Sequence, residues 1–184
     1  VYFLQNPLKI FAVWEGGMAF HGGMLGVVIA LAIARWKKNL PGGAIADTVI
    51  VPVALGLALG RVGNFINLEL YGTVTTLPWG ITIPGVEGLR HPTQIYAMGK
   101  DLLIAGICLW QLTKDRRLPY GRTCGLFFLL YGMGRFLLEY LREQDYPWTV
   151  IGEISFTRAQ LLCIPMIIAG IVVLIWLRPT SRKQ

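Results

Sequence analysis

Three charged residues recur at helical spacing in an otherwise apolar stretch of this sequence. Arg135, Glu139 and Arg142 stand at positions i, i+4 and i+7 in the run YGMGRFLLEYLR, so they share one face of a helix. Guanidinium groups in a partly dry site suit a phosphate, because their planar fork donates two hydrogen bonds to it at full charge. Two plainer explanations stay open. The first is that Arg135 and Glu139 only form an ion pair with each other within the helix. The second is that Arg142 only extends its side chain to place its charge at the water interface.

A further arginine lies in the glycine-rich run GRVGNFINLELYG, residues 60–72. Arg61 and Asn64 are three residues apart and share a helix face, and Glu69 follows near the end of the run. Glycines flank this segment and permit close approach of another backbone or of a ligand. The run therefore adds a second candidate phosphate-binding guanidinium with polar neighbours.

Two more motifs contain the histidines of the chain. His21 lies in FHGG, and His91 begins HPTQIY, where Pro92 suits the first turn of a helix and Gln94 offers hydrogen bonds. A lone histidine is more often structural than catalytic, and HPTQIY is also explained as a helix start with interfacial polar residues. Both alternatives stay open on the residues alone.

The elements that must position these motifs are membrane helices. Of the 184 residues, 54% are hydrophobic and 15% charged, and the mean hydropathy is +0.56. Soluble domains carry about 25% charged residues, so the composition excludes a disordered chain, a coiled coil and most cytosolic enzymes. It predicts an all-α integral membrane protein forming a single transmembrane domain over residues 1–184. Five transmembrane helices are expected at about 16–34, 44–67, 93–113, 123–142 and 157–177.

The positions of the basic residues predict the orientation of these helices. Lys and Arg cluster after the first, third and fifth expected spans. If successive spans cross the membrane in alternating directions, all three clusters lie on the same side. That side is cytoplasmic by the positive-inside rule, and the C-terminus is expected there. The four motifs then gather at or near the outer face, where a phosphate in a bilayer pocket implies a phospholipid. The net charge of +7 comes from these clusters and forms no continuous basic face, so nucleic acid is not expected as a partner.

Taken together and in this order, FHGG, GRVGNFINLELYG, HPTQIY and YGMGRFLLEYLR closely resemble the bacterial prolipoprotein diacylglyceryl transferase family. The resemblance covers the whole chain. It implies a seven-helix enzyme of the bacterial cytoplasmic (inner) membrane, so two N-terminal helices are expected to be missing from this sequence. The family transfers the diacylglyceryl group of phosphatidylglycerol to the lipobox cysteine of a prolipoprotein signal peptide. A thioether forms and glycerol 1-phosphate leaves.

The resemblance also implies roles for individual residues. His21 is the candidate base, since imidazole, with a usual pKa of ~6.5, can accept a proton from a thiol near ~8.5. Arg61 and Arg135 would bind the phosphate and stabilise the leaving group, with Glu139 orienting Arg135. The expected catalytic residues are His21, Arg61, Arg135 and Glu139. The expected phosphatidylglycerol-binding residues are Arg61, Asn64, Glu69, His91, Gln94, Tyr131, Arg135 and Arg142. Ala97 departs from the pattern, because the family commonly has Glu after the tyrosine of this motif.

No metal or organic cofactor is expected, since arginine can neutralise the leaving phosphate. Phosphatidylglycerol, signal peptides with a lipobox cysteine and membrane lipids are the expected partners. The three cysteines lack metal-ligand or CxxC spacing, and none follows the small residue that a lipobox needs. A transporter or channel is the alternative from another class, although it would favour charges spread along a pore and paired repeats. A catalytically inactive fragment is the third reading.

Overall fold

The structure is a computed structural model that describes residues 20–114, 119–143, 149–151 and 154–177. The chain divides into two compact units, Val1–Pro41 and Gly42–Gln184. In the first unit the described element is helix α2 (Phe20–Lys38). Its last turn carries Arg35, Lys37 and Lys38, whose charges complement the negative end of the helix dipole. The expected start of this span at residue 16 lies outside the described residues.

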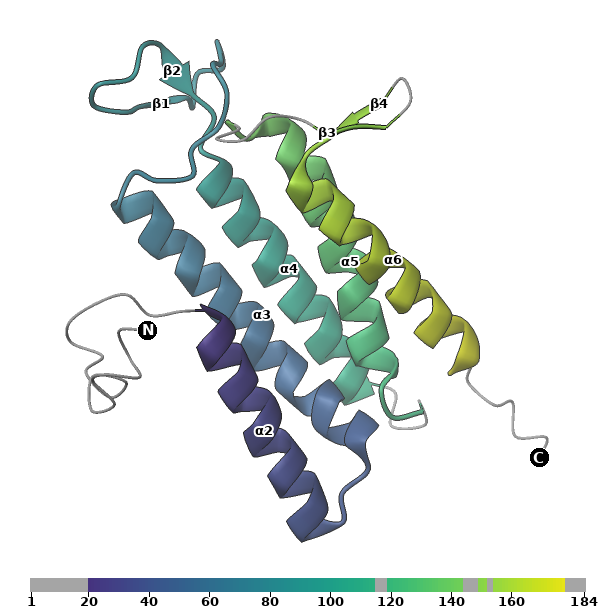
Figure 1. Cartoon of the computed structure of the whole chain (residues 1–184). Helices are drawn as coiled ribbons and strands as arrows, with labels where there is room; N and C mark the ends of the chain where they lie inside the picture. The colour runs from purple at the N-terminus through teal and green to yellow at the C-terminus, as the bar shows by residue number, and fades with distance from the viewer. Residues whose placement is uncertain (1–19, 115–118, 144–148, 152–153, 178–184) are drawn as a thin grey trace, which may run out of the picture. The chain divides into compact units, whose positions relative to one another are not determined.

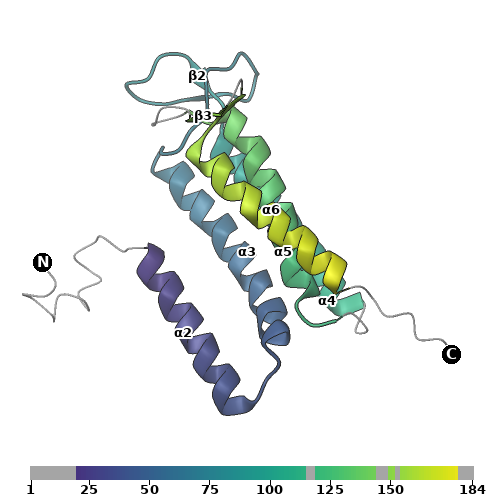
Figure 2. The same ribbon diagram turned by 45° about the vertical axis from the view of Figure 1, so that its right-hand side comes forward.

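The described residues of the second unit form four long helices, and Figures 1 and 2 show these helices running side by side. They are α3 (Gly42–Ile66), α4 (Thr93–Lys114), α5 (Arg122–Leu138) and α6 (Arg158–Trp176). A 3₁₀ turn, η3 (Glu139–Leu141), continues α5. Helix α5 packs against the other three, and α3 packs along α4. The observed bounds lie close to the ranges expected from the sequence. The single-domain organisation and the orientation stay predictions.

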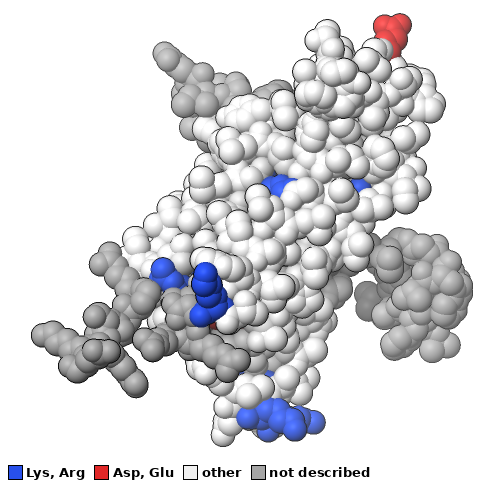
Figure 3. Space-filling view, turned by 180° about the vertical axis from the view of Figure 1, so that it is seen from behind, with Lys and Arg blue, Asp and Glu red and all other residues white. Residues whose placement is uncertain are grey.

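All four helices of this unit are long and apolar enough to cross a membrane. Their outer faces carry large exposed apolar side chains, such as Leu59, Leu103, Leu137 and Leu162. On the face seen in Figure 3, most of the described surface is free of charge, with lysine and arginine gathered mainly towards the lower end and acidic atoms at the top edge. Exposed apolar surface of this extent suits lipid as the surrounding solvent. The prediction of an all-α membrane protein is confirmed.

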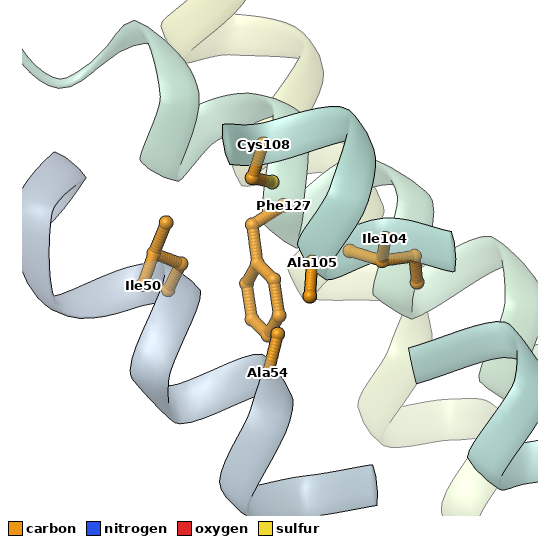
Figure 4. Packing of buried hydrophobic residues seen from close by; sticks show 6 residues of the cluster. All are labelled: Ile50, Ala54, Ile104, Ala105, Cys108 and Phe127. Carbon is orange, nitrogen blue, oxygen red and sulfur yellow. The ribbon is translucent and has the colours of Figure 1, made fainter. Parts of the chain in front are cut away.

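The core of the unit lies between α3, α4 and α5. Its buried side chains, shown in Figure 4, are Ile50, Ala54, Ile104, Ala105, Cys108 and Phe127. Small residues set the spacing of α5 and α6. A Cβ atom on Gly125 would lie 2.5 Å from Val173 Cγ1, and one on Gly170 would lie 2.6 Å from the backbone nitrogen of Leu129. The two backbones therefore touch, as is common where membrane helices pack through glycine.

At one end of the bundle, two charged side chains join helices through backbone groups. The Asp47 carboxylate of α3 accepts hydrogen bonds from the backbone nitrogens of Gly121 (2.7 Å) and Cys124 (2.8 Å), at the start of α5. Arg122 donates from Nη1 to the carbonyl oxygens of Leu174 (3.0 Å) and Leu177 (2.7 Å), at the end of α6. These contacts satisfy backbone groups that a helix terminus leaves unpaired.

At the other end, the segments that connect the helices form small hairpins, which were not predicted from the sequence. Strands β1 (Ile81–Thr82) and β2 (Leu89–Arg90) pair antiparallel between α3 and α4. Strands β3 (Thr149–Ile151) and β4 (Ile154–Phe156) do the same before α6. An isolated bridge joins Gly72 to Arg142. These pairings bring the segment after α3 onto the end of α5.

Candidate active site

A pocket lies where α3 ends, α4 begins and α5 ends. Its empty volume is about 270 Å³, including space open to solvent. The lining side chains belong to the motifs singled out in the sequence or to their neighbours: Arg61, Leu70, Thr93, Gln94, Ala97, Arg135, Leu138 and Arg142. Three guanidinium groups, one from α3 and two from the α5–η3 segment, therefore face one small space. Ala97 contributes only a methyl group where the resemblance leads one to expect a carboxylate.

Arg61 is held by a short relay of side chains at the end of α3. Its Nη1 donates to Asn64 Oδ1 at 3.3 Å, and Asn64 Nδ2 donates to Glu69 Oε1 at 2.7 Å. The backbone turns sharply here, with Leu68 at φ 55° and Leu70 at φ 58°. A left-handed conformation costs a non-glycine residue about 1–2 kcal/mol. The turn carries Glu69 back against Asn64, so local strain accompanies the polar contacts that orient Arg61.

The first turn of α4 fixes this segment from the other side. Thr93 Oγ1 donates to the carbonyl oxygen of Leu70 at 2.8 Å, and Gln94 Nε2 donates to that of Glu69 at 2.8 Å. Because Gln94 uses its nitrogen as the donor, its Oε1 is the atom left to accept a bond. Gln94 is 1% exposed and lines the pocket, and in the described part of the chain its Oε1 accepts no hydrogen bond. The pocket therefore combines cationic donors with one buried neutral acceptor.

Arg135 and Glu139 form an ion pair at the end of α5. Arg135 Nη2 lies 3.0 Å from Glu139 Oε2, and the two side chains are 19% and 3% exposed. The ion pair within the helix, one of the two plainer explanations from the sequence, is therefore present. Arg135 also lines the pocket, so the ion pair does not exclude a role in binding. Arg142 lines it too, while its backbone pairs with Gly72. Both arginines of the charged stripe therefore line the pocket.

The lack of a side chain at Gly72 permits the segment after α3 to lie against the end of α5 and the start of α4. A Cβ atom there would collide with the carbonyl oxygen of Leu141 and with the side chains of His91 and Thr93. The backbone nitrogen of Gly72 donates to the carbonyl oxygen of His91 at 2.9 Å, and that of Thr73 donates to Leu141 at 2.9 Å. Three segments distant in sequence thus meet at one residue without a side chain.

His91 stands beside the pocket and does not belong to its described lining. Its Nδ1 lies 3.4 Å from the hydroxyl of Tyr96, which accepts a 2.7 Å hydrogen bond from Trp79 Nε1. Its backbone is tied to Gly72 and Thr73. These contacts anchor the β1–β2 segment over the start of α4. The side chain of His21 lies outside the described part of the structure, so its role stays a prediction.

Tyr131 lies beside two charged residues that were not singled out from the sequence. Its ring stacks on that of Phe127, with the ring centroids 5.3 Å apart. Lys100 Nζ lies 4.0 Å from the centre of the same ring and 2.6 Å from Asp101 Oδ1. Both charged residues fall inside the expected span 93–113, and charge inside a span was the signal that should have singled them out.

The helices and the pocket define a class, that of a helical membrane protein with an arginine-lined site at one end of its bundle. A sequence model of the family described as "Prolipoprotein diacylglyceryl transferase" matches residues 1–176. Among similar proteins, the phosphatidylglycerol–prolipoprotein diacylglyceryl transferase of Polynucleobacter asymbioticus is 45% identical over 174 residues, which cover 94% of this chain and 66% of that protein. The protein of the same name from Nitratidesulfovibrio vulgaris is 43% identical over 187 residues, which cover 99% of this chain and 68% of that protein.

The chain spans about two thirds of the length of these curated relatives. A relative from Wolbachia pipientis with the same name gives a similar result, with 45% identity over 94% of this chain and 67% of that protein. The chain belongs to the prolipoprotein diacylglyceryl transferase family.

Proposed function

We propose that this protein transfers the diacylglyceryl group of phosphatidylglycerol to the lipobox cysteine thiol of prolipoprotein signal peptides. The observation that carries the proposal is the placement of Arg61 and Arg135 on different helices but in one pocket, each with its own polar partner. Two preorganised guanidinium groups suit a phosphodiester whose leaving oxygen gains charge. The names of the relatives agree with this chemistry.

The reaction breaks one bond and forms one. The cysteine sulfur attacks the diacylglyceryl carbon that carries the phosphate ester oxygen. The carbon–oxygen bond breaks, and its electron pair leaves with glycerol 1-phosphate. The thiol proton passes to a base, which we assign to His21. Arg61 and Arg135 stabilise the charge that develops on the departing phosphate, which is commonly the largest catalytic contribution.

The remaining site residues orient this machinery. Asn64 and Glu69 hold Arg61, and Glu139 holds Arg135, through the contacts described above. Gln94, Tyr131 and Arg142 complete the phosphatidylglycerol site, with the more distant His91 supporting its outer wall. The protein then acts as a multi-pass enzyme of the bacterial cytoplasmic membrane with its C-terminus in the cytoplasm, and it takes its lipid from the surrounding bilayer.

The direct test is product formation by the purified complete protein in detergent. Phosphatidylglycerol and a synthetic peptide with a lipobox cysteine should yield a peptide heavier by one diacylglyceryl group, detected by mass spectrometry. The same peptide with serine in place of cysteine should not react at comparable rate, because its hydroxyl is a far weaker nucleophile. Phospholipid flux in liposomes without any thioether product would instead favour a transporter. Absence of thioether product with the complete protein would refute the proposal.

A further inference from the structure

The short segment after η3 carries one of the pocket arginines on an extended backbone. Arg142 lines the pocket, and its φ of −90° and ψ of 139° mark the point where the helical turn ends. The segment 141–143 then runs antiparallel to 71–73. At its far end, the backbone nitrogen of Glu143 donates to the carbonyl oxygen of Tyr71 at 3.3 Å. This bond is longer than usual, so the backbone alone holds that end of the segment weakly.

An ion pair holds the same end of the segment from outside the pocket. Arg90 Nη1 donates to Glu143 Oε2 at 2.8 Å, although the two residues are 53 positions apart in sequence. Because side chains alternate along an extended backbone, Glu143 points to the face opposite Arg142. Neither Arg90 nor Glu143 lines the pocket. The ion pair therefore acts on the backbone that carries Arg142 and leaves the space in front of its guanidinium open.

Arg90 is the fixed partner of this pair. It is the last residue of β2, and its backbone pairs with Ile81 on one side and with Val74 on the other. Its side chain is 12% exposed, with the guanidinium carbon 5.8 Å from the centre of the Tyr71 ring. Figure 1 shows β2 at the end of the bundle where α5 ends. A cation that its surroundings already hold loses little conformational freedom when it pairs with a carboxylate.

Folding stability alone gives little reason for this ion pair. The side chain of Glu143 is 47% exposed, and water screens the charges of such pairs, which therefore stabilise a fold only slightly. A short hydrogen bond between two charged groups is nevertheless directional. Its effect here is to fix the position of the residue next to Arg142 relative to β2.

We propose that Arg90 and Glu143 form a positioning clamp, which holds the segment after η3 in place and so keeps the Arg142 guanidinium in the pocket. The effect on catalysis rests on the proposed function, in which Arg142 contributes to lipid binding, whereas the effect on the segment does not. Arg61 and Arg135 keep their own partners when the clamp is lost. Loss of the clamp should therefore weaken binding of phosphatidylglycerol and leave the chemical step largely unchanged.

The first test is the kinetics of the complete protein with a neutral residue in the clamp. Glu143→Gln keeps the size of the side chain and removes its charge, so KM for phosphatidylglycerol should rise roughly 3–10-fold while kcat changes less than about 2-fold. Glu87→Gln is the matched control, because Glu87 is exposed in the same β1–β2 hairpin and forms no ion pair within the described chain. Equal KM values for the two variants, or a fall in kcat without a rise in KM, would overturn the inference.

Two double-mutant cycles test the route from the clamp to the pocket. Arg90→Gln should add little to the KM of Glu143→Gln, because the same ion pair is already broken. Glu143→Gln should likewise add little in the Arg142→Met background, because the guanidinium that the clamp holds is then absent. Fully additive effects in either cycle would show that the residues act independently and would overturn the inference.

Amide hydrogen exchange tests the clamp without any need for transferase activity. The backbone amides of Thr73 and Glu143 donate the bonds that join the two segments. Both should exchange roughly 10-fold faster in Glu143→Gln than in Glu87→Gln, because the segment opens more often. Equal exchange in the two variants would overturn the inference even in an active enzyme. Faster exchange in a complete protein that makes no thioether product would uphold the clamp while refuting the proposed function.

Discussion

The side-chain nitrogen of Gln94 donates a 2.8 Å hydrogen bond to the backbone carbonyl oxygen of Glu69, and so ties the start of α4 to the segment after α3. Through Glu69 the same segment reaches Asn64 and then Arg61. One buried amide therefore shapes the pocket wall and, through this relay, supports an arginine of the site.

This bond predicts the effect of Gln94→Glu. The carboxylate cannot donate to the Glu69 carbonyl, and it places a negative charge where an anionic phosphate should bind. We expect KM for phosphatidylglycerol to rise roughly 10-fold or more, equivalent to about one lost hydrogen bond to a charged or buried group. Gln111→Glu, on the same helix but outside the pocket lining, is the control. Equal KM values for the two variants would remove Gln94 from the lipid site.

Replacement of Arg135 by lysine should abolish most activity although the charge is kept. Lysine is a compact point charge and cannot make the planar two-bond contact with a phosphate. The measurement is the initial rate of thioether formation with a lipobox peptide. A rate near that of the unmodified protein would exclude Arg135 from phosphate binding.

Glu139→Gln should be nearly as harmful as the loss of Arg135. The substitution removes the counter-charge 3.0 Å from a largely buried guanidinium, and breaking a buried pair in this way costs ~3–5 kcal/mol. Thermal unfolding and transferase rate should both be measured. If the variant retains its unfolding midpoint and its rate, Glu139 does not orient Arg135.

Arg61 and His21 should respond differently to pH. Arg61→Ala removes a preorganised donor and should slow the chemical step by roughly 10²–10³-fold at every pH. His21→Ala removes only the base, and at higher pH the acceptor thiol is already ionised. The rate of His21→Ala should therefore climb steeply towards pH 9, while that of Arg61→Ala stays low. Parallel profiles would mean that His21 has a role other than proton acceptance.

Asp47→Ala should destabilise the bundle at the end away from the pocket. It removes two hydrogen bonds from a carboxylate to the start of α5, and bonds to charged groups contribute about 1.5–3 kcal/mol each. The unfolding midpoint in detergent should fall clearly below that of Thr48→Ala. That control loses only an exposed bond from Thr48 Oγ1 to the carbonyl oxygen of Ala44 within α3. Equal midpoints would contradict a stabilising role for Asp47.

The sequence predicted the helices well because hydropathy and charge act locally. The range expected at 93–113 corresponds to Thr93–Lys114 in the structure, and that at 157–177 to Arg158–Trp176. Spacing along one helix also placed Arg135 and Arg142 on a common face. Their meeting with Arg61 in one pocket followed from the expected alternation of the helices and from the family resemblance.

Contacts between distant segments were beyond prediction from local pattern. The bridge between Gly72 and Arg142, and the capping of α5 by Asp47, join residues some 70 positions apart. The two short hairpins depend on such pairing and carry little strand signal of their own. Lys100 and Asp101 were not singled out, because adjacent residues do not share a helix face and the contact of Lys100 with the Tyr131 ring joins two different helices.

The contact between α5 and α6 has a consequence for how a two-tailed lipid can sit in this protein. Where Gly125 and Gly170 bring the two backbones together, even one added methyl group would collide with the opposite helix. A fatty-acyl tail is a chain of methylene groups that is about as wide as a methyl group along its whole length, so it needs at least the space that a single methyl group lacks there. No tail can therefore thread through that seam while the helices stay together, and a lipid whose headgroup occupies the pocket must extend both tails into the bilayer by another route.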